Sequence, residues 1–232
     1  MKLRACLSYF SRFEWGLYLS SVAVVLLSGL LSKEPDLLSL FSSLIGVTAL
    51  LFMAKGNPIG QALSILFGLL YGVISYTFSY YGEMITYMGM TVPMAALSLI
   101  SWWRNPSSRG HSEVEVGRLG RLDAVLLPLL SASVTVGFYF ALRALGTANL
   151  LPSTVSVTTS FAAVYLTFRR SPWYALAYAA NDIVLILLWV LASLGDPSYL
   201  TVVACFAAFL VNDLYACVNW QRLKRRQSAE KE

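Results

Sequence analysis

Residues 172–194 read PWYALAYAANDIVLILLWVLASL, an apolar run that is interrupted near its centre by Asn181 and Asp182. An α-helix rises about 1.5 Å per residue, so a run of this length covers the roughly 30 Å of hydrocarbon in a bilayer. Similar runs occupy most of the remaining chain, separated by clusters of polar, Pro and Gly residues. The sequence therefore predicts an all-α integral membrane protein of about eight transmembrane helices.

The expected spans have boundaries that the polar clusters place to within a few residues. The run that starts at Trp15 follows a basic segment and resembles a signal peptide, but no convincing small-residue cleavage site follows it, so we interpret it as a helix. The span that starts at Ser153 is short and rich in Ser and Thr. The eight spans are Trp15–Leu31, Leu37–Ala54, Pro58–Ser79, Gly82–Trp103, Asp123–Leu145, Ser153–Phe168, Pro172–Leu194 and Tyr199–Trp220.

The composition agrees with a membrane protein and argues against nucleic-acid binding. The chain of 232 residues is 57% hydrophobic and only 12% charged, whereas soluble domains carry about 25% charged residues. The net charge of +5 comes from Lys and Arg residues in short segments between the apolar runs, not from one polar face. The three cysteines are widely spaced, so we expect free thiols and no disulfide.

The Lys and Arg residues also predict the orientation, because basic residues of short loops stay on the cytoplasmic side. With the N-terminus inside, every Lys and Arg except Lys33 and Arg143 falls in an inside segment. We therefore expect both termini in the cytoplasm.

A weak internal repeat relates two stretches of the single membrane domain. Each copy has a basic turn followed by Pro (Lys55-Gly56-Asn57-Pro58 and Arg169-Arg170-Ser171-Pro172), then two long helices of which the second ends in Trp and Arg. Parallel three-helix repeats with a site at the bilayer midplane are a transporter architecture. The predicted parts are an extra helix (15–31), repeat 1 (37–103), an inner loop (104–121), a linker helix (123–145), repeat 2 (153–220) and a basic cytoplasmic tail (221–232).

Polar residues inside the spans are the first candidates for a binding site, because an intramembrane acid costs a few kcal/mol unless it faces a cavity or a partner. Asn181 and Asp182 lie deep in their span, and Asn212 lies beside Asp213 in the last one. Hydrogen bonding between helices is the alternative role for both pairs.

Aromatic and amide side chains complete the candidate site. Trp189 shares a helical face with Asn181 and could stack on a flat heterocycle, although a Trp facing lipid is a close alternative. Gln61 and Tyr71 lie on one stripe with small residues, and Tyr87 lies near the outer mouth, four residues after Glu83. The other tryptophans lie at span ends and are expected in the interfacial belts: Trp15, Trp102, Trp103, Trp173 and Trp220.

Motifs for catalysis are missing from the sequence. A single histidine, His111, rules out an H-E-x-x-H zinc site, and there is neither a G-x-S-x-G elbow nor a P-loop. A membrane enzyme is the rival function, which would require Asp182 and Asp213 to converge as an aspartyl pair, and a structural or sensor protein is a third possibility. We expect no catalytic residue, no metal and no cofactor.

Several segments together resemble the PnuC-type vitamin transporters over about residues 42–222. These segments are Ile45-Gly46-Val47-Thr48, Ala54-Lys55-Gly56-Asn57-Pro58, Tyr80-Tyr81-Gly82-Glu83-Met84, Trp102-Trp103-Arg104-Asn105, Thr167-Phe168-Arg169-Arg170-Ser171-Pro172, Tyr178-Ala179-Ala180-Asn181-Asp182 and Val218-Asn219-Trp220.

This resemblance implies a carrier for nicotinamide riboside in the bacterial inner membrane, with a fold akin to the SWEET sugar transporters and commonly a homotrimer. It implies facilitated diffusion, with cytoplasmic phosphorylation trapping the vitamin. Relatives carry thiamin, riboflavin or deoxynucleosides, so these remain alternative substrates.

Overall fold

The computed structural model describes residues 9–31, 37–77, 81–108, 110–147, 149–195 and 200–231. Within these ranges, eight helical segments are long and apolar enough to cross a membrane. The expected all-helical fold with eight spans is thus confirmed. In order, the elements are α2 (Arg12–Leu31), α3 (Leu37–Ala54), α4 (Ile59–Thr77), α5 (Tyr81–Thr86), η1 (Tyr87–Thr91), α6 (Val92–Arg104), β1 (Pro106–Ser107), β2 (Gly110–Val114), α7 (Arg121–Ala144), α8 (Leu150–Phe168), α9 (Tyr174–Ser193) and α10 (Leu200–Ala229).

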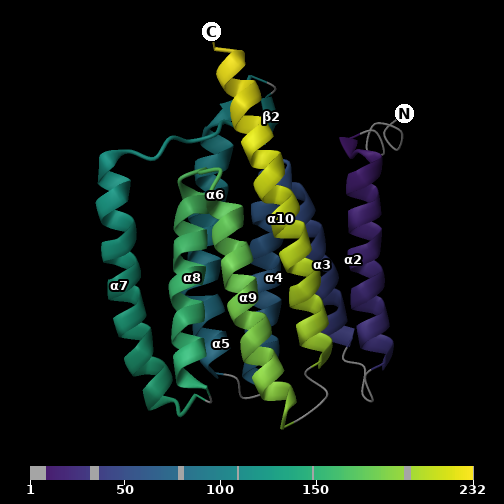
Figure 1. Cartoon of the computed structure of the whole chain (residues 1–232), viewed down its shortest axis with the longest axis vertical. Coiled ribbons are helices and arrows are strands. Elements are labelled where there is room, and N and C mark those ends of the chain that lie inside the picture. Colours follow the sequence, from purple (N-terminus) through teal and green to yellow (C-terminus); the bar gives the residue numbers. More distant parts are fainter. Residues whose placement is uncertain are drawn as a thin grey trace.

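The helices run side by side along the long axis of the molecule, with α7 and α2 at opposite edges (Figure 1). The start of α2 and the C-terminal end of α10 lie at the same end of the bundle. We call this the basic end. It holds the turns after α3 and α8, the segment between α6 and α7, and the last part of α10.

Three features differ most from the sequence-based expectation. Helix α8 begins at Leu150 instead of Ser153, which gives it 19 residues. Helix α10 does not end at Trp220 but continues to Ala229, so the predicted basic tail is largely helical. The segment between α6 and α7, predicted as an inner loop, contains a two-stranded antiparallel sheet, β1 with β2.

The helices pack as two groups of three that are joined crosswise. In the first group α4 packs against α3 and α6, and in the second α9 packs against α8 and α10. The groups meet where α3 contacts α10 and where α6 contacts α8. Helix α7 packs on α8, while α2 packs on α3 and α10. This arrangement is what two parallel repeats, a linker helix and an additional N-terminal helix would produce.

Two tryptophans make equivalent hydrogen bonds between the groups. The indole Nε1 of Trp102 in α6 donates to the carbonyl oxygen of Thr167 at 2.9 Å, and that of Trp220 in α10 donates to the carbonyl oxygen of Met53, also at 2.9 Å. Both acceptors lie three residues before a left-handed residue, Gly56 (φ 68°) or Arg170 (φ 55°). Each half of the molecule therefore satisfies a carbonyl at the helix end of the other half.

These hydrogen bonds correct one expectation about the aromatic residues. Trp102 and Trp220 are both 0% exposed, so neither belongs to a lipid-facing belt. They contact each other and Tyr174 in the apolar core at the basic end. Because Trp at a span end commonly lies in the interface, sequence position alone could not separate these two from the exposed Trp103 and Trp173.

Candidate functional site

The buried acids of α9 and α10 meet in the middle of the bundle. Asp182 lies eight residues into the 20-residue helix α9, about 12 Å from its start at 1.5 Å per residue. Its carboxyl group is hydrogen-bonded to that of Asp213 in α10, and the two residues are 4% and 3% exposed. The sequence allowed for this convergence, and the structure brings the two acids together.

Asn181 faces helix α8 and not helix α10, which carries Asp213. Its Oδ1 accepts hydrogen bonds from Thr159 Oγ1 at 2.7 Å and from Ser160 Oγ at 3.0 Å. The residue is 6% exposed. The carbonyl oxygen of this amide thus joins α9 to α8, and the Ser/Thr-rich sequence of α8 supplies the donors.

An aromatic group lies between α4 and the span that contains η1. The rings of Tyr71 and Tyr87 have centroids 4.5 Å apart, and Phe67 stacks on Tyr71 at 5.6 Å. Tyr87 also interacts electrostatically with Asp182 across the bundle. Two of the sequence-predicted residues, Tyr71 and Tyr87, are therefore in contact.

The π-helical turn η1 sets the position of Tyr87. The amide of Val92 donates to the carbonyl oxygen of Tyr87, five residues earlier, and Thr91 Oγ1 donates to the carbonyl oxygen of Thr86. Pro93 follows directly, and because proline has no N–H it cannot continue an α-helical pattern of hydrogen bonds. Single π-helical turns inside longer helices are frequent at functional sites.

Glycines in α4 allow η1 to approach closely. A Cβ atom on Gly68 would lie 2.7 Å from Val92 Cγ2, and one on Gly72 would lie 2.6 Å from Met88 Sδ. Any larger residue would push the two helices apart. The small-residue stripe of α4 thus serves close packing, as its spacing suggested.

The remaining predicted residues lie around this centre. Trp189 is 5% exposed, so it does not face lipid, and it packs in an apolar cluster with Phe206, Phe209 and partly buried Phe67. Asn212 donates from Nδ2 to Ser21 Oγ at 2.8 Å and so faces α2. Gln61 is 2% exposed, but it lies ten residues before Tyr71, which is about 15 Å along α4.

Phe67, Phe209 and the π-helical turn were not identified from the sequence as parts of this region. Phe67 connects Tyr71 to Phe209, with centroids 6.1 Å apart for the second pair. Apolar rings carry no polar signal, so only the packing reveals them. Pro93 in the middle of a span, four residues after Gly89, is a signal that could have indicated the irregular turn.

The chemistry available here is binding, not bond making. The hydroxyl, amide and carboxyl groups can donate and accept hydrogen bonds, and the aromatic faces can stack on a flat ring. Among the described residues, no three His, Cys, Asp or Glu side chains lie close enough to hold a metal ion. Small-molecule sites of this kind are mostly apolar and orient the ligand through a few polar groups.

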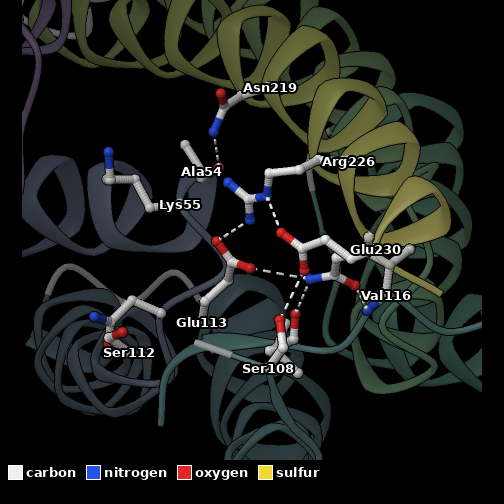
Figure 2. A network of polar contacts seen from close by, with 12 residues as sticks. Ala54, Lys55, Ser108, Ser112, Glu113, Val116, Asn219, Arg226 and Glu230 are labelled. Carbon is white, nitrogen blue, oxygen red and sulfur yellow. Dashed lines mark hydrogen bonds and ion pairs between the residues drawn. The ribbon is translucent and has the colours of Figure 1, made fainter. Parts of the chain in front are cut away.

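At the basic end, polar contacts join the segment between α6 and α7 to the end of α10 (Figure 2). The amide of Val114 donates to the carbonyl oxygen of Gly56 at 2.8 Å, and that of Gly117 donates to the carbonyl oxygen of Arg170 at 2.9 Å. One segment therefore bridges the two equivalent turns. A Cβ on Gly117 would lie 2.1 Å from the carbonyl oxygen of Arg169, so this crossing requires glycine.

The helical extension of α10 holds the same segment in place. Gln227 accepts from the Val116 amide at 2.8 Å and donates to the Val114 carbonyl oxygen at 3.0 Å. Arg226 forms an ion pair with Glu113, as drawn in Figure 2. The part of α10 beyond the predicted span thus has a structural role at the basic end.

Comparisons with known proteins agree with a membrane carrier. The family model described as nicotinamide mononucleotide transporter matches residues 36–222. The chain is 28% identical over 204 residues to the nicotinamide riboside transporter PnuC of Neisseria mucosa, covering 85% of this chain and 77% of that one. It is 23% identical over 198 residues to the protein of the same name from Haemophilus influenzae, covering 84% of each.

A solved structure has the same fold. The crystal structure of the vitamin B3 transporter PnuC matches with a TM-score of 0.80 at 23% identity, covering 94% of each chain. The family model covers most of the sequence, from the start of α3 into α10. The chain belongs to the nicotinamide mononucleotide transporter (PnuC) family, and it is therefore a multi-pass membrane transporter and not an enzyme.

Proposed function

We propose that this transporter carries nicotinamide riboside and binds it between α4, η1, α9 and α10. The observation that carries the proposal is the contact between Tyr71 and Tyr87, at 4.5 Å between ring centroids, beside the buried acid of Asp182. An aromatic face can stack on the nicotinamide ring, while hydroxyl, amide and carboxyl groups can bind ribose hydroxyls. Both named relatives are nicotinamide riboside transporters, which supports the same substrate here.

In this proposal the predicted residues have three different roles. Tyr71, Tyr87, Asp182 and Asn181 contact the substrate, and Trp189 shapes the apolar wall behind them. Gln61 and Asn212 remain predicted binding residues, although the bond from Asn212 to Ser21 also fastens α2.

The distribution of basic residues supports a proposal for the orientation of the transporter and for the membrane that contains it. We propose that the basic end faces the cytoplasm of a bacterium and that the protein lies in the inner membrane, because basic segments are retained inside. Transport is by facilitated diffusion, since the intramembrane acids form no relay with histidine, and phosphorylation in the cytoplasm traps the vitamin. The assembly is a homotrimer.

The test is uptake into sealed proteoliposomes that contain the purified protein and no proton or sodium gradient. Labelled nicotinamide riboside should enter, and unlabelled nicotinamide riboside should compete better than thiamin, riboflavin or a deoxynucleoside. Preferred uptake of one of these three would identify another vitamin or nucleoside as the substrate. A strict requirement for an ion gradient would refute facilitated diffusion.

A further inference from the structure

Among the described residues, no Lys or Arg side chain interacts with the acid pair in the middle of the bundle. Every Lys and Arg of the chain lies between spans or within a few residues of a span end. Among the described residues, the ionisable groups that interact with the pair are Tyr174 and Tyr178 of α9, Tyr87 of η1 and Cys205 of α10. None of these carries a positive charge in any protonation state.

The contact between the two carboxyl groups determines how many protons they hold. A hydrogen bond from Asp182 to Asp213 needs a proton on one of them, because an ionised carboxylate only accepts. Two ionised carboxylates in contact, at 4% and 3% exposure, would repel each other strongly. The pair therefore holds at least one proton, and full ionisation is excluded.

One oxygen of the pair is unsatisfied. Asp182 Oδ2 is buried without a hydrogen-bond partner among the described residues. A buried carboxyl oxygen without a partner is costly. The unsatisfied oxygen belongs to the acid that also interacts electrostatically with Tyr87.

We propose that Asp182 and Asp213 share one proton and present a single negative charge, which selects substrates that carry one positive charge. The inference rests on the proposed function, because the nicotinamide ring of nicotinamide riboside is a pyridinium cation. The rings of Tyr71 and Tyr87 would add attraction to that cation through their faces. Bound together, the pair and the substrate are neutral, which lowers the cost of holding either charge inside the membrane.

A shared proton gives a specific pattern for amide substitutions. Asp182→Asn or Asp213→Asn alone leaves one carboxylate, so the single negative charge remains. The double variant, Asp182→Asn with Asp213→Asn, removes the charge and keeps the size and the hydrogen-bonding groups. Selection for a cation should therefore survive either single change and disappear in the double variant.

The experiment compares two ligands that differ in charge. Nicotinamide riboside is a cation, and its 1,4-dihydro form is neutral with nearly the same size and the same ribose and carboxamide groups. Dissociation constants of both are measured by calorimetry on the purified, full-length protein and on the three variants, with monodispersity in detergent as the check of folding. Glu115→Gln is the matched control, because it removes one acid at the basic end, where Glu115 pairs with Lys231.

We expect the unaltered protein, the Glu115→Gln control and both single variants to prefer the cation by about tenfold or more, and the folded double variant to bind both forms equally. Equal binding of the two forms by the unaltered protein would overturn the charge selection while leaving the proposed substrate in place. A cation preference that persists in the double variant would overturn it as well. Binding of neither form by the unaltered protein would instead refute the proposed function, and the inference with it.

Discussion

The acids at the basic end and the acids inside the membrane have opposite surroundings. At the basic end, Glu14 pairs with Lys55 at 3.1 Å and Asp123 with Arg169 at 2.7 Å. In the middle of the bundle, Asp182 and Asp213 contact each other, and no positively charged group of the described residues interacts with them. The acids at the basic end are neutralised by Lys and Arg residues of the protein. For the acid pair in the middle of the bundle, we propose that a bound ligand supplies the positive charge.

This contrast predicts different effects of substitution in the two regions. Changes at the basic end should lower stability and leave substrate preference intact. Changes in the middle should alter binding in protein that still folds.

The largest loss of stability is expected for Asp123→Ala. Asp123 is 5% exposed and accepts from Arg169 Nη2, from Tyr165 Oη and from the Gly120 amide, each at 2.8 Å. Removing the carboxylate leaves the buried Tyr165 hydroxyl and a partly exposed guanidinium without an acceptor, at a cost of about 2 to 3 kcal/mol. Thermal unfolding of the purified variant measures this loss.

Tyr165→Phe is the matched control for that variant, because it removes one hydrogen bond and leaves the ion pair. Its loss should be about 1 kcal/mol. If Asp123→Ala proved as stable as the unaltered protein, the basic end would not depend on its paired charges.

A smaller and equal loss is expected for Trp102→Phe and Trp220→Phe. Each change removes one indole N–H that satisfies a carbonyl of the other half at 2.9 Å. Each carbonyl oxygen keeps a backbone donor, Gly56 or Arg170, so the lost indole hydrogen bond and the lost packing of a fully buried side chain should cost about 1 to 2 kcal/mol in either case. Thermal unfolding of the two variants in the same detergent measures the effects, and a strong asymmetry would argue against equivalent roles for the two repeats.

The smallest effect is expected for Glu115→Gln. Glu115 is largely exposed, and the hydrogen bond from Lys231 lowers its pKa. A lowered pKa in the folded protein stabilises it at neutral pH, and this contribution is lost as the pH falls through that pKa. Since the pair is exposed, we expect a change below about 0.5 kcal/mol, seen by thermal unfolding at pH 7 and absent at pH 3. A loss at pH 7 as large as that of Asp123→Ala would show that the exposed charges at this end matter as much as the buried ones.

The sequence predicted the helices well because length and hydropathy determine them directly. Leu37–Ala54 has the predicted boundaries, and the other spans differ by a few residues at most, except where α10 continues past Trp220 as a polar helix. The part of α10 beyond Trp220 lacks the apolar pattern of a membrane span, so hydropathy could not predict that the helix continues. It forms because Arg226 and Gln227 find partners in the segment between α6 and α7.

The candidate site was harder to predict because contacts between helices depend on how each helix is rotated about its own long axis. The sequence indicated Asp182 as a buried acid, and Tyr71 and Tyr87 as polar aromatics, but not that the two rings touch. The π-helical turn changes which face Tyr87 presents, and a regular helical pattern cannot anticipate it. Asn181 and Asn212 are each followed by an Asp in the sequence, yet Asn181 faces α8 and Asn212 faces α2.

The most direct test of the central claim is the affinity of Asn181→Leu for nicotinamide riboside, measured by calorimetry on monodisperse protein. Leucine is similar in size but cannot bond polar groups of the substrate, and the loss should be about 1 to 3 kcal/mol, or roughly 5- to 150-fold in the dissociation constant. We predict this loss in a variant that inserts into the membrane and assembles as the unaltered protein does. Normal binding by Asn181→Leu, or failure of the variant to assemble, would contradict the account and show that Asn181 serves helix packing through Thr159 and Ser160.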